Sequence, residues 1–205
     1  MLNKASQKKS TTITSKSSSR LGKTLYLIRH GQSTSNRDYC EDDSYRDAPL
    51  SDKGIAQAKA IVRELELEQI ELILVSPLTR ALQTCTNAIG IYAQTKHIPV
   101  IVLPQISEII STYYSCGRKR DDIEKQFPTF DWSNVPEDKK WWWPFETKGS
   151  ETHTHVTERI AETKRFISTR QEKRIAVFSH GDFLYDFMGE QSAYLANCQW
   201  VKYEI

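Results

Sequence analysis

The sequence is poor in the features that mark membrane, secreted and metal-stapled proteins. No apolar run approaches the ~20 residues of a membrane-spanning helix, and the N-terminus lacks the continuous apolar stretch of a secretory signal. The four cysteines lie far apart and form no CxxC pair, which removes the main support for zinc or thioredoxin-like sites. We therefore expect a reduced, cytoplasmic setting without a membrane partner. The cysteines are Cys40, Cys85, Cys116 and Cys198.

A large net charge is missing as well. The 28 lysines and arginines exceed the 26 acidic residues by two, so a basic surface for nucleic acid is not indicated. The balance is uneven, because residues 1–23 hold six cations and no acids, which leaves the remainder with a net charge of −4. Residues 1–22 are mostly Ser, Thr and Lys and cannot bury enough apolar area to offset their ordering entropy. We predict a flexible basic tail over 1–22 and a single domain over 23–205.

Apolar runs alternate with segments of helical period along the rest of the chain. The predicted strands cover residues 23–28, 71–75, 97–103, 174–178 and 198–204. Four helices are predicted: one that begins at a cap on Ser51, one over 81–92, a short one over 118–127, and a long one that begins at a cap on Ser150. Between 111 and 149 the pattern weakens, which indicates an irregular insertion. The alternation predicts an α/β domain of three layers, α/β/α, with a mainly parallel central sheet.

Polar clusters follow four of the predicted strands. Arg29 and His30 follow the first strand, Arg80 the second, Glu108 the third and His180 the fourth. Ligands of open α/β sheets bind beyond the carboxyl ends of the strands, so we expect these side chains to converge at one edge. Their convergence is a stronger signal than any single motif.

Such a cluster suits phosphoryl transfer. Arg29 and Arg80 carry rigid forks of donors for phosphate oxygens. Gly31 leaves space for a ligand to approach the backbone, and a helix beginning near Ser33 adds amide donors. A neutral imidazole is a nucleophile toward phosphorus, a second histidine and the arginines stabilise the equatorial oxygens, and a carboxylic acid protonates the departing alcohol. This chemistry needs neither a divalent metal nor a cofactor.

Four motifs, in order, resemble one family. RHGQSTSN, PLSDKGIAQA, SPLTRALQT and SHGDF are similar to the motifs of the histidine phosphatase superfamily, in the branch of the cofactor-dependent phosphoglycerate mutases and fructose-2,6-bisphosphatases. The RHG-x-S-x-x-N form separates this branch from the acid phosphatases and phytases. The resemblance covers roughly residues 24–205 and implies a phosphoglycerate mutase-like fold.

The resemblance also implies roles for individual residues. His30 would be the phosphorylated nucleophile, and Glu108 would be the proton donor. The phosphate pocket would be formed by Arg29, Asn36, Arg80 and His180, with a backbone contact from Gly181. The sequence around Glu108 differs from the family's usual acid context, so the alternative acids are Asp182 and the acidic stretch Glu41-Asp42-Asp43.

The function predicted from these features is metal-independent hydrolysis of a phosphomonoester through a phosphohistidine. The expected partner is a small phosphorylated substrate, with a phosphopeptide as an alternative, and the oligomeric state is open. One rival is a mutase, but Asn36 leads into RDYCEDDSYRDAPL rather than the tryptophan-rich stretch of the glycolytic mutases. The other rival is a non-catalytic module on the same fold that binds a phospholigand or a protein.

Several features are open or are set aside. The C-x5-R spacing of Cys40 and Arg46 encloses an acidic, glycine-free loop that would repel phosphate, so we interpret it as chance. His153 and His155 are interpreted as surface or cap residues, and Arg118–Arg120 as a solvated helix start. The run Trp141–Trp143 is either a pocket floor, a docking surface or a small hydrophobic cluster under the insertion. Substrate specificity is expected to lie in residues 37–47 and 111–150.

Overall fold

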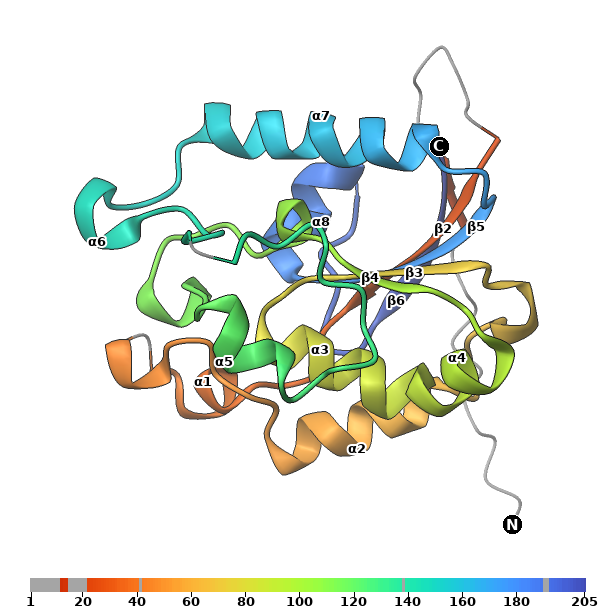
Figure 1. Cartoon of the computed structure of the whole chain (residues 1–205), viewed down its shortest axis with the longest axis horizontal. Helices are drawn as coiled ribbons and strands as arrows, with labels where there is room; N and C mark the ends of the chain where they lie inside the picture. The colour runs from red at the N-terminus through yellow and green to blue at the C-terminus, as the bar shows by residue number, and fades with distance from the viewer. Residues whose placement is uncertain (1–11, 15–21, 41, 138, 190–191) are drawn as a thin grey trace.

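The computed structural model describes residues 12–14, 22–40, 42–137, 139–189 and 192–205. These residues form a six-stranded sheet in the order β1-β6-β2-β5-β3-β4, with helices on both faces (Figure 1). The predicted three-layer α/β architecture is confirmed. The strands are β1 (Thr12–Thr14), β2 (Thr24–Arg29), β3 (Leu72–Val75), β4 (Val100–Val102), β5 (Arg174–Ser179) and β6 (Trp200–Glu204).

The sheet is mainly parallel, as predicted. β2 pairs in parallel with β5, β5 with β3, and β3 with β4. Only β6, among the described strands, is antiparallel to its neighbour β2, and β1 adds to the outer side of β6. The carboxyl ends of β2, β3, β4 and β5 therefore share one edge of the sheet.

The helices divide between the two faces of the sheet. Figure 1 shows α7 and α8 on one side and α2, α3 and α4 on the other. The α-helices are α1 (Thr34–Asp38), α2 (Asp52–Ile61), α3 (Thr79–Cys85), α4 (Ile91–Lys96), α5 (Arg120–Glu124), α6 (Phe145–Lys148), α7 (His153–Thr169) and α8 (Gly181–Met188). A short π-helix, η3 (Thr86–Gly90), joins α3 to α4. The 3-10 helices are η1 (Asp43–Tyr45), η2 (Leu67–Gln69), η4 (Pro104–Ile106) and η5 (Tyr113–Ser115).

Alternate residues of each central strand feed two separate cores. Along β2, Tyr26 and Ile28 join the core under α2, α3 and α4, whereas Leu25 and Leu27 join the core under α7 and α8. Successive side chains of a strand point to opposite faces, so a strand covered on both faces must be apolar throughout. This is why the central strands read as continuous apolar runs.

Several predicted boundaries are wrong for local reasons. His97 and Cys198 have positive φ values of 54° and 56°, so neither begins a strand. The cap of α7 is Thr152, whose side chain accepts from the amide of His155, and not Ser150. The helix predicted over 118–127 is limited to α5.

The predicted tail is only partly visible. Residues 1–11 and 15–21 lie outside the described residues. Thr12–Thr14 form the edge strand β1 beside β6, which the sequence did not predict. No helix of the described residues combines the length and the apolarity that crossing a membrane requires.

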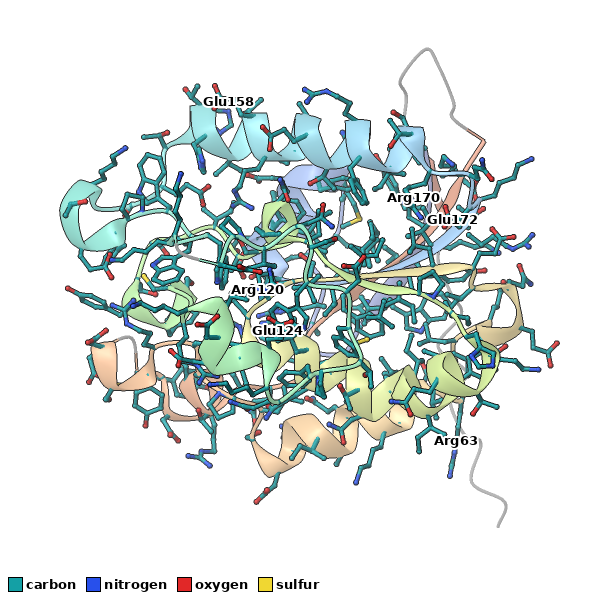
Figure 2. The ribbon with its side chains drawn as sticks, viewed as in Figure 1. Arg63, Arg120, Glu124, Glu158, Arg170 and Glu172 are labelled. Atoms are coloured by element: carbon teal, nitrogen blue, oxygen red, sulfur yellow. The ribbon has the colours of Figure 1, made fainter. Side chains whose placement is uncertain are left out.

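Two of the ion pairs on or beside the helices are partly exposed. Arg120 pairs with Glu124 one turn along α5, and Arg170 pairs with Glu172 after α7 (Figure 2). Exposed pairs of this kind contribute only about 0–1 kcal/mol each. Such pairs contribute little to holding the polar cluster at the sheet edge, and buried contacts hold it instead.

Candidate active site

The two motif histidines meet at the carboxyl edge of the sheet. His30 follows β2 and His180 follows β5, and the amide of His30 donates to the carbonyl of Ser179 at 2.9 Å. Their ring centroids lie 5.0 Å apart, and the residues are 2% and 0% exposed. The structure thus brings together the ends of two neighbouring parallel strands, as their shared edge requires.

Hydrogen bonding fixes the tautomer of His30. Its Nδ1 lies 2.6 Å from the carbonyl oxygen of Gly31, and a carbonyl can only accept. Nδ1 therefore carries the proton of the neutral ring, and Nε2 keeps its lone pair. Burial, with Arg80 and Arg29 nearby, holds the pKa of His30 well below its usual range. The ring is neutral at pH 7 and presents Nε2 as a nucleophile.

His180 has the complementary arrangement. Its Nε2 lies 2.8 Å from Oγ of Ser76, and that oxygen already accepts from the amide of Leu78 at 3.3 Å. Within the described residues the Ser76 hydroxyl has no other acceptor for its hydrogen, so it donates to Nε2, which leaves the ring proton on Nδ1. Burial and Arg80 hold the pKa of His180 well below its usual range. Nδ1 is then a buried donor.

Arg80 reaches His30 from the first turn of α3. Its Nε lies 3.3 Å from Nε2 of His30, and its Nη1 donates to the carbonyl of Tyr114 at 3.0 Å. The guanidinium also lies over the Tyr114 ring, 5.5 Å from the centroid. Arg80 is only 1% exposed, so its charge acts in a medium with little screening.

Arg29 is held from the opposite direction by the segment before β6. Its Nη1 donates to the carbonyl of Leu195 at 2.7 Å, and its guanidinium lies 5.0 Å from the centroid of the Tyr194 ring. A Cβ on Gly181 would lie 2.3 Å from the Tyr194 hydroxyl and 3.0 Å from Cζ of Arg29. Gly181 is therefore required for this packing, in addition to any backbone contact it makes with a ligand.

Three buried nitrogen atoms of this cluster have no hydrogen-bond partner: Nε of Arg29, Nη2 of Arg80 and Nδ1 of His180. Buried polar groups are nearly always hydrogen-bonded, so each such atom needs an explanation. Three orphaned nitrogen donors on two guanidiniums and an imidazole, around the lone pair of His30, match the oxygens of a tetrahedral anion.

Glu108 lies at the N-terminus of α8. Its Oε1 accepts from the amides of Ile109 at 2.9 Å and Phe183 at 3.1 Å, and the residue is 5% exposed. Burial, aided by the charge of Asp182, raises the pKa of Glu108 to about 7, against the opposing effects of Arg80 and the two amides. A carboxylic acid with this pKa can donate a proton near neutral pH.

The alternative acids occupy other positions. Asp182 is exposed and accepts from the hydroxyl of Tyr194 at 2.9 Å. Asp42 caps η1 through the amide of Ser44, and Asp43 pairs with Arg46. Glu41 lies outside the described residues. The buried carboxyl among these candidates is Glu108.

The structure gives a reason for a glycine at position 31 that differs from the predicted space for a ligand. Its amide donates to Oγ1 of Thr84, and a Cβ there would lie 2.6 Å from the carbonyl oxygen of Gly54. The space beside Gly31 is thus filled by the N-terminal turn of α2 rather than left for a ligand.

Asn36 forms a capping box with Ser33 at the start of α1. The box uses Oδ1 of Asn36 and leaves its side-chain amino group for other contacts.

A cavity of about 370 Å³ opens beside Arg29 and Asn36. Four of its lining residues belong to the RHGQSTSN motif, and three more lie in the segments 37–47 and 111–150 that were expected to set specificity, whereas Asn197 was not predicted. Outside the cavity, Ser76, the partner of His180, was also not predicted, although it follows β3 directly. The cavity is lined by Arg29, Gln32, Ser35, Asn36, Tyr39, Cys40, Tyr114 and Asn197.

A second buried group missed by the sequence is Asp47. Its two oxygens accept from the amide and the hydroxyl of Thr79, each at 2.6 Å, and Oδ2 also accepts from Nε of Arg118 at 2.9 Å. Thr79 is the first residue of α3, directly before Arg80, and Leu78 offers no side-chain cap. Asp47 thus caps α3 from a distant loop. Arg118, interpreted above as solvated, is part of this network.

The insertion packs against this edge of the sheet. Trp142 is buried with Ile110 and Cys116, which supports the interpretation of the tryptophan run as a small hydrophobic cluster. Trp141 donates through Nε1 to the carbonyl of Arg118 at 2.8 Å. His155 lies against Trp143, with ring centroids 4.8 Å apart.

The segment that carries Glu108 is held by an ion pair. Arg159 of α7 donates to the carbonyls of Gln105 and Ser107, and its guanidinium forms two hydrogen bonds with Glu151. Within the described ranges, no three His, Cys, Asp or Glu side chains converge as a metal site requires. Metal independence itself stays a prediction.

The comparisons agree with the geometry. The model of the histidine phosphatase superfamily, branch 1, matches residues 25–190. A protein of Schizosaccharomyces pombe named as a probable phosphatase is 34% identical over 163 residues, covering 78% of this chain and 75% of the relative. A phosphoglycerate mutase-like protein of Arabidopsis thaliana is 29% identical over 224 residues, covering 86% of this chain and 82% of the relative.

A solved structure supports the fold. The mycobacterial glucosyl-3-phosphoglycerate phosphatase, in a complex with VO3, superposes with a TM-score of 0.59 at 18% identity. The match covers 88% of this chain and 90% of that one. At this identity the likeness shows a shared fold.

Proposed function

The chain belongs to branch 1 of the histidine phosphatase superfamily, and on that premise we propose that it hydrolyses a phosphomonoester through a phosphohistidine at His30. The observation that carries the proposal is the set of orphaned buried nitrogens on Arg29, Arg80 and His180, beside His30 Nε2, whose lone pair accepts, within the described residues, only from Nε of Arg80 at 3.3 Å. A phosphoryl group would satisfy all three nitrogens at once and place phosphorus within reach of that lone pair.

In the first step, Nε2 of His30 forms a bond to phosphorus while the bond from phosphorus to the leaving oxygen breaks. The electron pair goes to the leaving oxygen, which takes the proton of Glu108 and departs as an alcohol. Arg29, Arg80 and His180 Nδ1 donate to the equatorial oxygens, where charge is concentrated in the transition state. The Gly31 carbonyl accepts from Nδ1 and stabilises the ring as it becomes positive.

In the second step, water bonds to phosphorus while the N–P bond breaks. The water proton goes to the Glu108 carboxylate, and the electron pair returns to Nε2, which regenerates both groups and releases inorganic phosphate. The raised pKa of Glu108 suits both directions of proton transfer near pH 7. No other group is needed for the cycle to balance.

The test uses the whole protein with p-nitrophenyl phosphate. We expect His30→Ala to lower kcat by at least about a thousandfold, as removal of a nucleophile does. His153→Ala, at an exposed histidine on α7, is the matched control. Rapid quenching with a labelled substrate should trap phosphate on the wild type in a form that is acid-labile and base-stable. Full activity in His30→Ala would contradict the mechanism.

The two rivals give different results in the same preparation. A mutase would convert 3-phosphoglycerate to 2-phosphoglycerate in a coupled assay, with stimulation by bisphosphoglycerate. A binding module would bind vanadate without turnover of any phosphomonoester. We favour hydrolysis because the S. pombe relative is named as a probable phosphatase and the loop after Asn36 departs from the mutase pattern.

We also propose that the protein is cytoplasmic. The support is the set of four separated cysteines, all of which are free thiols in the structure. Microscopy of the tagged full chain tests the location.

A further inference from the structure

The cavity beside the phosphate pocket carries little charge. Arg29 is the single charged side chain in its lining, and the proposed phosphate site already uses that guanidinium. The remaining polar lining is neutral. Gln32 uses its Oε1 to accept from Ser51, and Asn36 uses its Oδ1 in the capping box, so each presents its amino group as a donor. A ligand that fills this space should offer neutral acceptors.

The two arginines of the segment that follows Asn36 are already paired with carboxylates. Arg37, next along from Asn36, forms two hydrogen bonds with Asp38. Arg46 pairs with Asp43 and with Glu146. Each of these guanidiniums has its charge compensated. A second anionic group on the substrate would have to break one of these pairs to gain a partner.

The rim next to Cys40 is acidic. Cys40, which lines the cavity, donates through Sγ to Oδ2 of Asp42 at 3.2 Å. Among the described residues, no lysine or arginine lies within ion-pair distance of this Asp42 carboxylate, because Arg37 and Arg46 pair with other acids. The field at this rim therefore opposes an additional negative group.

Tyr39 presents an aromatic surface at the same mouth. It closes α1 in the left-handed conformation, with φ 52°, and its amide donates to the carbonyl of Ser35. The residue is 93% exposed, although it lines the cavity. A tyrosine ring with one apolar face and a polar tip suits a ligand that is both hydroxylated and carbon-rich.

We propose that the site selects monophosphates of neutral, hydroxyl-rich leaving groups, such as sugars or polyols, and discriminates against substrates with a second phosphate. The volume of about 370 Å³ lies near the lower end of the ~300–1,000 Å³ typical of small-molecule pockets, which favours a small leaving group over a protein segment. This inference rests on the proposed function, since it concerns the leaving group of the same reaction.

The first test compares matched substrates with the wild-type protein. We expect kcat/KM for fructose 6-phosphate to exceed that for fructose 1,6-bisphosphate by about tenfold, the ratio that corresponds to a difference of about 1.4 kcal/mol. Equal or faster turnover of the bisphosphate would overturn the inference, and so would a preference for a phosphotyrosine peptide over the sugar phosphate.

The second test changes the rim. Tyr39→Ala should lower the ratio of kcat/KM for fructose 6-phosphate to kcat/KM for methyl phosphate by several-fold, because methyl phosphate is too small to reach the ring. Tyr39→Arg should raise the relative use of the bisphosphate. Tyr92→Ala, on the distant α4, is the control for loss of a tyrosine. Unchanged ratios in both Tyr39 variants would overturn the assignment of Tyr39.

The same assays distinguish a failure of the proposed function from a failure of the proposed substrate class. If the wild type releases no phosphate from any of these substrates, or His30→Ala retains the activity, the phosphatase mechanism itself is wrong. If turnover depends on His30 but the substrate ratios contradict those above, the mechanism stands and only the substrate class is wrong.

Discussion

Glu108→Gln should stabilise the folded protein by an amount that depends on pH, and it removes the proposed proton donor. The amide is close in shape to the carboxyl and can still accept from the backbone amides of Ile109 and Phe183. What it cannot do is ionise. In the wild type, ionisation of Glu108 places a charge in a site that is 5% exposed, which is why burial raises its pKa to about 7 from the usual 4.5.

The magnitude follows from this difference in pKa. Folding binds the Glu108 proton more tightly, so the protonated carboxyl favours the folded state at low pH, and this contribution is lost as the pH rises through about 7. The full cost of ionising the folded carboxyl is about 3 kcal/mol well above pH 7, at 1.36 kcal/mol for each pKa unit. At pH 5 it is about 1 kcal/mol. We therefore expect the stability gain of Glu108→Gln to increase by about 2 kcal/mol between pH 5 and pH 8.

The assay is urea denaturation of both proteins at several pH values, followed by subtraction of the two free energies of unfolding at each pH. Subtraction cancels the titration of groups that the variants share. Glu158→Gln, at an exposed position on α7 (Figure 2), controls for the loss of one carboxylate. Asp182→Asn should reduce the pH dependence, because the Asp182 charge contributes to the raised pKa of Glu108. A stability difference that is flat from pH 5 to pH 8 would refute the reasoning.

Three further predictions follow from the buried contacts. Because the pKa of His30 lies well below its usual range, kcat/KM should not rise with pH through 6.5, as it would if the His30 ring lost its proton there. It should fall above pH about 7 as Glu108 ionises. A profile that rises through pH 6.5 would contradict this prediction. Gly31→Ala forces a Cβ to within 2.6 Å of the Gly54 carbonyl and should cost about 1–3 kcal/mol of unfolding free energy in urea denaturation. Asp47→Ala should cost about 1–3 kcal/mol of unfolding free energy, because it uncaps α3 and removes the acceptor of the buried Thr79 amide and hydroxyl, whereas Asp47→Asn should recover part of the loss. Equal stability of these variants and the wild type would contradict the network.

The sheet edge that holds the candidate site could be predicted because its signals are local. A buried parallel strand must be apolar on both faces, so the strands could be recognised, and polar residues directly after them had to share one edge. His30 and His180 follow β2 and β5 directly. Arg80 lies further on, in α3 after β3, and Glu108 follows η4 after β4, yet the structure places both at the same edge. The packing of Gly31 against Gly54 could not be predicted, since the sequence shows that a small residue is needed but not which neighbour occupies the space.

The remaining contacts left no signal in the sequence, because they are made by backbone atoms. Arg80 is oriented by the carbonyl of Tyr114 and Arg29 by the carbonyl of Leu195. Any residue supplies a carbonyl, so neither partner can be identified from its type. Both carbonyls lie in segments whose course depends on tertiary packing: the first in the insertion, the second before the antiparallel strand β6. Changes in these two segments can therefore reorient the arginines without altering any side chain of the candidate site. Under the proposed function, the leaving-group preference can then diverge while the phosphate chemistry stays the same.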